Sequence, residues 1–284
     1  MFNIKIISGR NSLLMGHAQS PYTIQSFDGL DGISVDVTMS QGFGQIGETL
    51  DNLTVQSRPM GIIGKIYNFK PSQLRELEYI FAPLSKVRIE FEEKYWIDAV
   101  VKNSPVFSYN LRAVSYAVQL VAPYPFWKTA EANYYKLGAL TGGFNFPVNY
   151  STPHNFAQVS DVLYMNCYNA GNTKVDYSAE IMCTSGEATN ITLTNAQTQE
   201  FVRINTTVTA ADTVRIFREN NVLQVTKTTN GIVKSIFADL DENSNLDYMQ
   251  IGDNIIRADY ESGAAQLVVA ISFYDTLTGV HYGV

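Results

Sequence analysis

Short strand-like segments run through almost the whole chain, and they limit its possible folds more than any other feature. In the first part, alternating or β-branched patterns predict strands at residues 2–7, 22–27, 33–40, 53–69, 86–92, 95–101 and 112–121. From about residue 134 onward, further strand-like segments alternate with turn signals such as Asn230-Gly231. Such segments satisfy their backbone hydrogen bonds only by pairing, so we expect a mostly β protein.

The second half is expected to be an antiparallel sandwich or barrel. Its short strands recur at intervals of roughly ten residues, which is typical of these folds. One of its predicted hairpins turns at Ala170-Gly171-Asn172, and two closing strands follow Gly252-Asp253-Asn254.

A single segment has helical periodicity. Pro71 and Ser72 favour a helix start, and four apolar residues then recur at spacings of 3, 4 and 3, which places one apolar stripe against a sheet. These residues are Leu74, Leu77, Phe81 and Leu84. The first half is therefore predicted to be α+β, mostly strand with one packed helix.

The length of 284 residues is enough for about two domains. The strand at 112–121 stops in an aromatic, proline-rich stretch, after which the composition changes and becomes loop-rich. That stretch consists of Pro123, Tyr124, Pro125, Phe126 and Trp127. We interpret it as a structural domain junction in which the prolines end the strand and the aromatic rings anchor the chain, with domains at 1–130 and 131–284.

Charge and cysteine content narrow the possible functions. The net charge is −7, with 11 Lys and Arg against 11 Asp and Glu in residues 1–127, and 9 against 16 in residues 128–284. Neither part has the basic stripe that tight nucleic-acid binding needs. Cys167 and Cys183 match no metal or redox spacing, and no stretch approaches the length of a membrane helix.

No catalytic, cofactor or metal site is predicted. The sequence GFGQIG, residues 42–47, fits the dinucleotide-binding pattern in letters only, because it leads into another predicted strand and not into a helix. We interpret it as a hairpin tip. The three histidines, His17, His154 and His281, are scattered and lack the spacing of a metal site. Enzyme activity is therefore not expected.

The order of features along the chain carries a family resemblance. Arg58 and Pro59 open the strand SRPMGIIGKIYNF, a helix and a hairpin follow, and the next strand ends at Pro123 to Trp127. A β-sandwich ending in IGDNIIRADYESGAAQLVVAISFYDT completes the chain. This arrangement resembles the distal tail proteins (Dit) of long-tailed, siphovirus-type phages and prophages.

The resemblance implies an N-terminal ring-forming domain, related to tail-tube proteins, and a C-terminal galectin-like antiparallel β-sandwich. It implies a structural virion protein that forms a homo-hexameric hub ring at the distal end of the tail. Its partners would be the tail tube protein, the tail-associated lysin or tail spike, and receptor-binding proteins. DNA would cross the channel without specific binding, there would be no membrane insertion, and assembly would take place in the bacterial cytoplasm.

Two alternatives remain at this point. A carbohydrate-binding protein would use the C-terminal sandwich and aromatic residues such as Tyr134, Tyr135 and Tyr150. A baseplate or tube component of a contractile tail system would share the β-rich composition without the same role.

Overall fold

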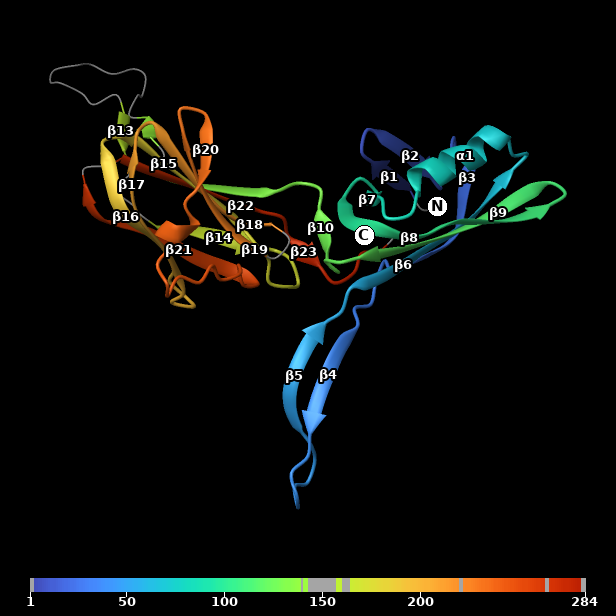
Figure 1. Cartoon of the computed structure of the whole chain (residues 1–284), viewed down its shortest axis with the longest axis horizontal. Helices are drawn as coiled ribbons and strands as arrows, with labels where there is room; N and C mark the ends of the chain where they lie inside the picture. The colour runs from blue at the N-terminus through green and yellow to red at the C-terminus, as the bar shows by residue number, and fades with distance from the viewer. Residues whose placement is uncertain are drawn as a thin grey trace, which may run out of the picture. The chain divides into compact units, whose positions relative to one another are not determined.

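The structure is a computed structural model that describes residues 3–138, 140–142, 157–159, 164–219, 222–263 and 266–281. In these residues the regular structure is almost entirely β, with one α-helix (Figure 1). The predicted mostly β fold is confirmed. The chain forms two compact units, Met1–Glu131 with Thr276–Val284 (unit 1) and Ala132–Asp275 (unit 2).

Unit 1 is built on one large antiparallel sheet. Among the described residues its strands follow the order β2-β1-β7-β8-β9-β6-β3. They are β1 (Ile4–Ser8), β2 (Asn11–Met15), β3 (Tyr22–Asp28), β6 (Arg58–Tyr67), β7 (Lys86–Phe91), β8 (Tyr95–Asn110) and β9 (Ala113–Ala122). Alternate side chains of these strands are buried in a core of their own, as the period-2 patterns predict.

The helix α1 (Pro71–Ile80) packs against β1, β2 and β8. Proline is favoured in its first turn because the ring fixes φ and the missing N–H has no helical partner there. Leu77 and Phe81 are fully buried, as the predicted stripe requires, but the inclusion of Leu84 was wrong. The helix ends at Ile80, and Leu84 is 86% exposed with a left-handed φ of 68°.

Strands β4 (Val35–Ser40) and β5 (Thr49–Val55) form a separate two-stranded hairpin, which we call the arm. It projects from unit 1 on the side away from α1 (Figure 1). The GFGQIG sequence connects its two strands, so the predicted hairpin tip is confirmed. The strand predicted at 53–69 is interrupted between β5 and β6, at Gln56 and Ser57.

Unit 2 is an antiparallel β-sandwich, as predicted for the second half. In the described residues, a six-stranded sheet has the order β11-β22-β15-β18-β19-β20, and a four-stranded sheet has the order β14-β21-β16-β17. The strands of the first are β11 (Asn133–Leu137), β22 (Gln266–Phe273), β15 (Ser178–Ser185), β18 (Asp212–Glu219), β19 (Val222–Thr229) and β20 (Ile232–Ser235). Those of the second are β14 (Tyr164–Asn169), β21 (Gly252–Gly263), β16 (Glu187–Asn195) and β17 (Phe201–Thr209).

Both sheets contribute to one apolar core, so they pack face to face. A short pair, β12 (Leu140–Gly142) and β13 (Ala157–Val159), and a 3-10 turn, η1 (Phe237–Asp239), complete the described part of unit 2.

The predicted hairpin at Ala170-Gly171-Asn172 is wrong. Strand β14 pairs with β21, whereas β15 belongs to the other sheet, so the chain crosses the sandwich at this turn. The buried side chain of Asn169 redirects it by accepting from the Gly171 amide at 3.0 Å and donating to the Thr173 carbonyl at 3.0 Å. The Asn230-Gly231 turn is confirmed, because both residues have the positive φ that a type I′ hairpin needs.

One carboxylate is buried in unit 2. Asp212 is 5% exposed and accepts the Thr209 amide at 2.9 Å, the Thr229 hydroxyl, and the Lys227 ammonium at 3.0 Å. Burial raises the pKa of this carboxyl, but the hydrogen bonds from Thr229, Thr209 and Lys227 outweigh that effect and lower it well below its usual value.

The last residues of the chain return to unit 1, which differs from the predicted second domain of 131–284. Strand β23 (Thr276–Leu277) pairs with β10 (Trp127–Thr129), which also pairs with β8. Unit 2 is therefore inserted into the chain of unit 1 between β10 and β23. Sequence periodicity could not show this, because β23 is only two residues long.

Candidate assembly surfaces

The Arg58-Pro59 pair lies at the start of β6, directly after the arm. Arg58 is opposite Ala122 and Pro59 is opposite Val121 in the β6–β9 ladder. On the other side of β6 the ladder with β3 stops at Gly61. Pro59 is therefore not paired with β3, and its missing N–H costs no hydrogen bond on that side.

The Arg58 side chain is 3% exposed and donates to four backbone carbonyls. Its Nε donates to Pro125 at 2.6 Å, one terminal nitrogen donates to Gly29 at 2.9 Å and Asp31 at 3.2 Å, and the other donates to Thr278 at 2.5 Å. Burial lowers the pKa of the Arg58 guanidinium, and the nearby Asp31 opposes that shift. The group remains a cation whose donors are used for structure.

These contacts bring together the two sequence motifs predicted to matter, although 67 residues separate Arg58 from Pro125. The four carbonyls belong to three segments of unit 1: the chain entering the arm, the Pro123 to Trp127 stretch, and the C-terminal return. We call the side chain and these carbonyls the Arg58 clamp. Because Gly29 has a φ of 97° and a Cβ there would lie 2.9 Å from the Pro59 carbonyl, glycine allows this close approach.

Trp127 is fully buried beside the Arg58 clamp. Its Nε1 donates to the same Gly29 carbonyl at 3.2 Å, and its ring packs against Phe27 and Phe91, with centroid distances of 6.5 and 6.2 Å. The rest of the stretch is less uniform. Pro125 is buried, Pro123 is exposed, and Tyr124 and Phe126 are half-buried, with their rings 5.3 Å apart.

The arm has one apolar face and one polar face. Cross-strand pairs place Val35 opposite Val55, Val37 opposite Leu53 and Met39 opposite Leu50. These six side chains are between 44% and 57% exposed. The other face carries Asp36, Thr38, Asn52 and Thr54. An isolated two-stranded hairpin with an uncovered apolar face is marginally stable in water.

The tip of the arm presents Phe43 and Ile46, both fully exposed. Gln45 organises it: its side-chain oxygen accepts the Gly42 amide at 2.9 Å, and its side-chain nitrogen donates to Thr49 at 2.8 Å. The tip is therefore held in place locally while its two apolar side chains face solvent.

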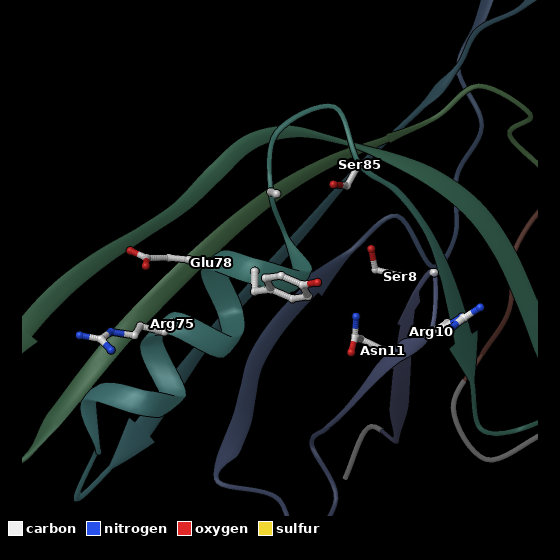
Figure 2. Close-up of a pocket in the computed structure, with 9 residues that line it drawn as sticks. Ser8, Arg10, Asn11, Arg75, Glu78 and Ser85 are labelled. Atoms are coloured by element: carbon white, nitrogen blue, oxygen red, sulfur yellow. The ribbon is translucent and has the colours of Figure 1, made fainter.

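An open hollow of about 940 Å³ lies elsewhere on unit 1, between α1 and the β1–β2 turn (Figure 2). Its lining includes Arg10 from the turn, Arg75, Glu78 and Tyr79 from the helix, and Ser85 from the following loop. Among the described residues, neither Arg10 nor Arg75 has an ion-pair partner. No pattern in the sequence had singled out this hollow or the apolar face of the arm.

The aromatic residues considered for sugar binding do not form one described surface. Tyr134 is exposed, but Tyr135 stacks on Phe273 with centroids 5.9 Å apart, and its hydroxyl bonds the Tyr168 backbone. Tyr150 and His154 lie outside the described residues. In the part of the chain that is described, no group of three or more metal-ligating side chains occurs, and no helix has the length and hydropathy to cross a membrane.

Comparison with known proteins finds similarity to components of phage tails. Residues 170–275 match the family described as siphovirus-type tail component, C-terminal domain, and this match ends where unit 2 ends. In sequence, no curated protein matches the chain.

Among solved structures, Dit of phage SPP1 aligns with a TM-score of 0.66 and 9% identity, covering 95% of this chain and 98% of that one. That protein is described as a paradigm of the hub adsorption apparatus of phages infecting Gram-positive bacteria. A chain of the phage P2 baseplate in its activated conformation with Ca aligns with a TM-score of 0.53 and 11% identity, covering 96% and 98%. Likeness at these identities shows a shared fold.

The fold and the family match together show a likeness to structural components of phage tails. More particularly, they confirm the resemblance to the distal tail proteins of siphovirus-type phages, through the sequence match in residues 170–275 and the fold shared with Dit of phage SPP1.

Proposed function

We propose that the protein assembles into a homo-hexameric hub ring at the distal end of the tail. The observation that carries the proposal is the uncovered apolar face of the arm. Covering the exposed half of six apolar side chains would contribute roughly 5 to 9 kcal/mol before entropic costs. A second copy of the chain supplies this cover in a ring, where each copy both gives and receives an arm.

The Arg58 clamp supports the same proposal from the other end of the arm. A projecting hairpin binds a partner more tightly when its root is fixed, because immobilising a hinged hairpin would add an entropic cost to association. Arg58 follows the arm in sequence and binds carbonyls of Gly29 and Asp31, which precede it. The segment that enters the arm and the segment that leaves it are therefore both fixed to unit 1. In this proposal the clamp and Trp127 serve as the structural junction predicted for Arg58, Pro59 and Pro123 to Trp127.

As a hub, the ring would contact the tail tube on one face and the tail-associated lysin or tail spike on the other, with receptor-binding proteins at its periphery. DNA would pass through the channel without specific binding. The chain would act without catalysis and assemble in the host cytoplasm. The near-neutral balance of residues 1–127 supports a channel that does not retain DNA by counterion release.

The test is the molar mass in solution by size-exclusion chromatography with light scattering. Six copies of the 31.6 kDa chain give about 190 kDa. The double variant Val37→Lys, Leu53→Lys places charge on the apolar face and should shift the mass toward that of the monomer. The matched control, Thr38→Lys, Thr54→Lys, places the same charges on the polar face and should keep the ring. A monomeric wild-type chain at every concentration would refute the proposal.

A further inference from the structure

We propose that the tip of the arm of one copy docks into the hollow between α1 and the β1–β2 turn of the next copy. The proposal rests on ring formation and adds the surface that receives the arm. Its two halves are the exposed pair Phe43 and Ile46 and the hollow lined by Arg10, Arg75 and Tyr79.

The arm reaches beyond its own unit. Eight residues of extended chain separate Val35 from Phe43, which gives a reach of roughly 25 to 30 Å. A unit of this size has a radius of gyration of about 14 Å. The arm also projects on the side of unit 1 away from α1 (Figure 1), and α1 supplies part of the lining of the hollow. The arm is therefore directed away from the hollow of its own copy, which leaves the hollow of a second copy as the receiving surface.

The charges of the two surfaces are complementary. Residues 34–57 contain Asp36, Glu48 and Asp51 and no lysine or arginine. Arg10 comes from the β1–β2 turn, and Arg75 and Glu78 come from the helix, so the two arginines lie at opposite sides of the hollow (Figure 2). The arginines have no ion-pair partner among the described side chains, so an acidic segment would supply one.

One residue that lines the hollow and one residue next to the lining expose apolar surface. Tyr79 is 71% exposed, and Leu84, one residue before the lining Ser85, is 86% exposed. Leu84 also has a φ of 68°, a costly conformation for a branched residue, and its amide donates to the Val101 carbonyl at 3.2 Å. We interpret this exposed residue in a costly conformation as part of the surface that a second copy covers.

The tip of the arm is ordered by its own hydrogen bonds before it docks. Because Gln45 satisfies polar groups within the turn, docking Phe43 and Ile46 does not require the turn to rearrange. Gly44 and Gly47 have positive φ, and no atom lies within 4 Å of the position that a Cβ would take at either residue, so a partner's backbone can approach them closely. The hollow of about 940 Å³ has room for both apolar side chains.

A charge-exchange experiment tests the docking on the full chain. Arg10→Glu, Arg75→Glu should raise the concentration of half-maximal ring formation at least tenfold in light scattering. Adding Glu48→Arg, Asp51→Arg should restore it to within about threefold. Lys102→Glu, Arg112→Glu reverses two exposed charges elsewhere on unit 1 and should change it less than threefold.

Cysteine pairing gives an independent measurement, because both native cysteines are buried. Phe43→Cys with Tyr79→Cys should give disulfide-linked multimers on non-reducing gels after diamide oxidation, whereas Phe43→Cys with Leu111→Cys should not. A ring that forms normally but shows neither the charge effect nor the Phe43–Tyr79 cross-link overturns the docking and leaves the hub proposal standing. A wild-type chain that stays monomeric overturns both.

Discussion

Replacing Arg58 by methionine should destabilise unit 1 by about 3 to 5 kcal/mol. The Gly29 carbonyl keeps the Trp127 donor, but the carbonyls of Asp31, Pro125 and Thr278 lose the guanidinium. Each unsatisfied buried carbonyl costs about 1 to 3 kcal/mol, and removing a buried cation recovers part of the total. Arg58→Lys should cost less, because it keeps the charge but not the planar fork.

The assay is urea unfolding followed by tryptophan fluorescence. The chain has two tryptophans, Trp96 and Trp127, and both lie in unit 1, so the signal reports this unit. With a slope of about 2 kcal/mol per molar urea, the midpoint should fall by roughly 1.5 to 2.5 M.

Arg88→Met is the control. Arg88 pairs with Asp98 at 2.8 Å and lies 3.9 Å from the centroid of the Trp96 ring, but the two charged side chains are 45% and 58% exposed, so the loss should stay near or below about 1 kcal/mol. A loss below about 1 kcal/mol for Arg58→Met as well would show that the clamp does not hold these segments together.

Three further predictions concern packing, pH and thiol chemistry. Gly64→Ala should lower the free energy of unfolding by about 2 to 4 kcal/mol in the same urea assay, because its Cβ would lie 2.0 Å from the Thr23 carbonyl. Gly61→Ala on the same strand meets only ordinary contacts and should lower it by under about 1 kcal/mol; equal losses would contradict this. Since the pKa of Asp212 is lower in the folded state, its contribution to stability should be complete above about pH 5 and decline progressively as the pH falls below about 4 toward the folded-state pKa. Asp212→Asn should remove that part of the pH dependence of thermal unfolding, and an unchanged profile would refute it. Burial raises the pKa of Cys167 to about 12 and also raises the pKa of Cys183. Neither thiol should therefore react with Ellman's reagent at about pH 8 until urea unfolds the chain, and fast labelling of the native protein would contradict their burial.

Local patterns predicted the elements of unit 1 well where each strand packs against its own subunit. Alternation in β6 and β9 corresponds to alternating burial, and Leu77 and Phe81 lie on the buried stripe of the helix region. Alternation failed to distinguish burial within a subunit from exposure on its surface. Strand β4 of the arm has the same period-2 pattern as a core strand, yet the apolar face of the arm is uncovered in the isolated chain. Periodicity reports which side chains share a face, and it does not identify what covers that face.

Contacts between residues far apart in the sequence were the second feature that local patterns could not predict. Arg58 and Pro125 were each singled out in the sequence, but no local pattern states that one donates to the other. The hairpin predicted at Ala170 was wrong for a related reason, because a turn signal is compatible with a hairpin and with a crossing between sheets. The buried Asn169 selects the crossing, and its burial depends on the surrounding sandwich.

The Arg58 clamp also makes the fixing of the arm root depend on synthesis of the C-terminal residues. Its guanidinium binds carbonyls on the chain that enters the arm and the carbonyl of Thr278, and these segments are separated by the whole of unit 2 in sequence. The arm root therefore gains its full set of contacts only after unit 2 has been synthesised and residues 276–281 have joined unit 1. Because a loosely held arm binds at a greater entropic cost, the apolar face of the arm is best fixed for association once the subunit is complete. This order reduces the time during which a fixed, uncovered apolar hairpin is presented by an unfinished chain.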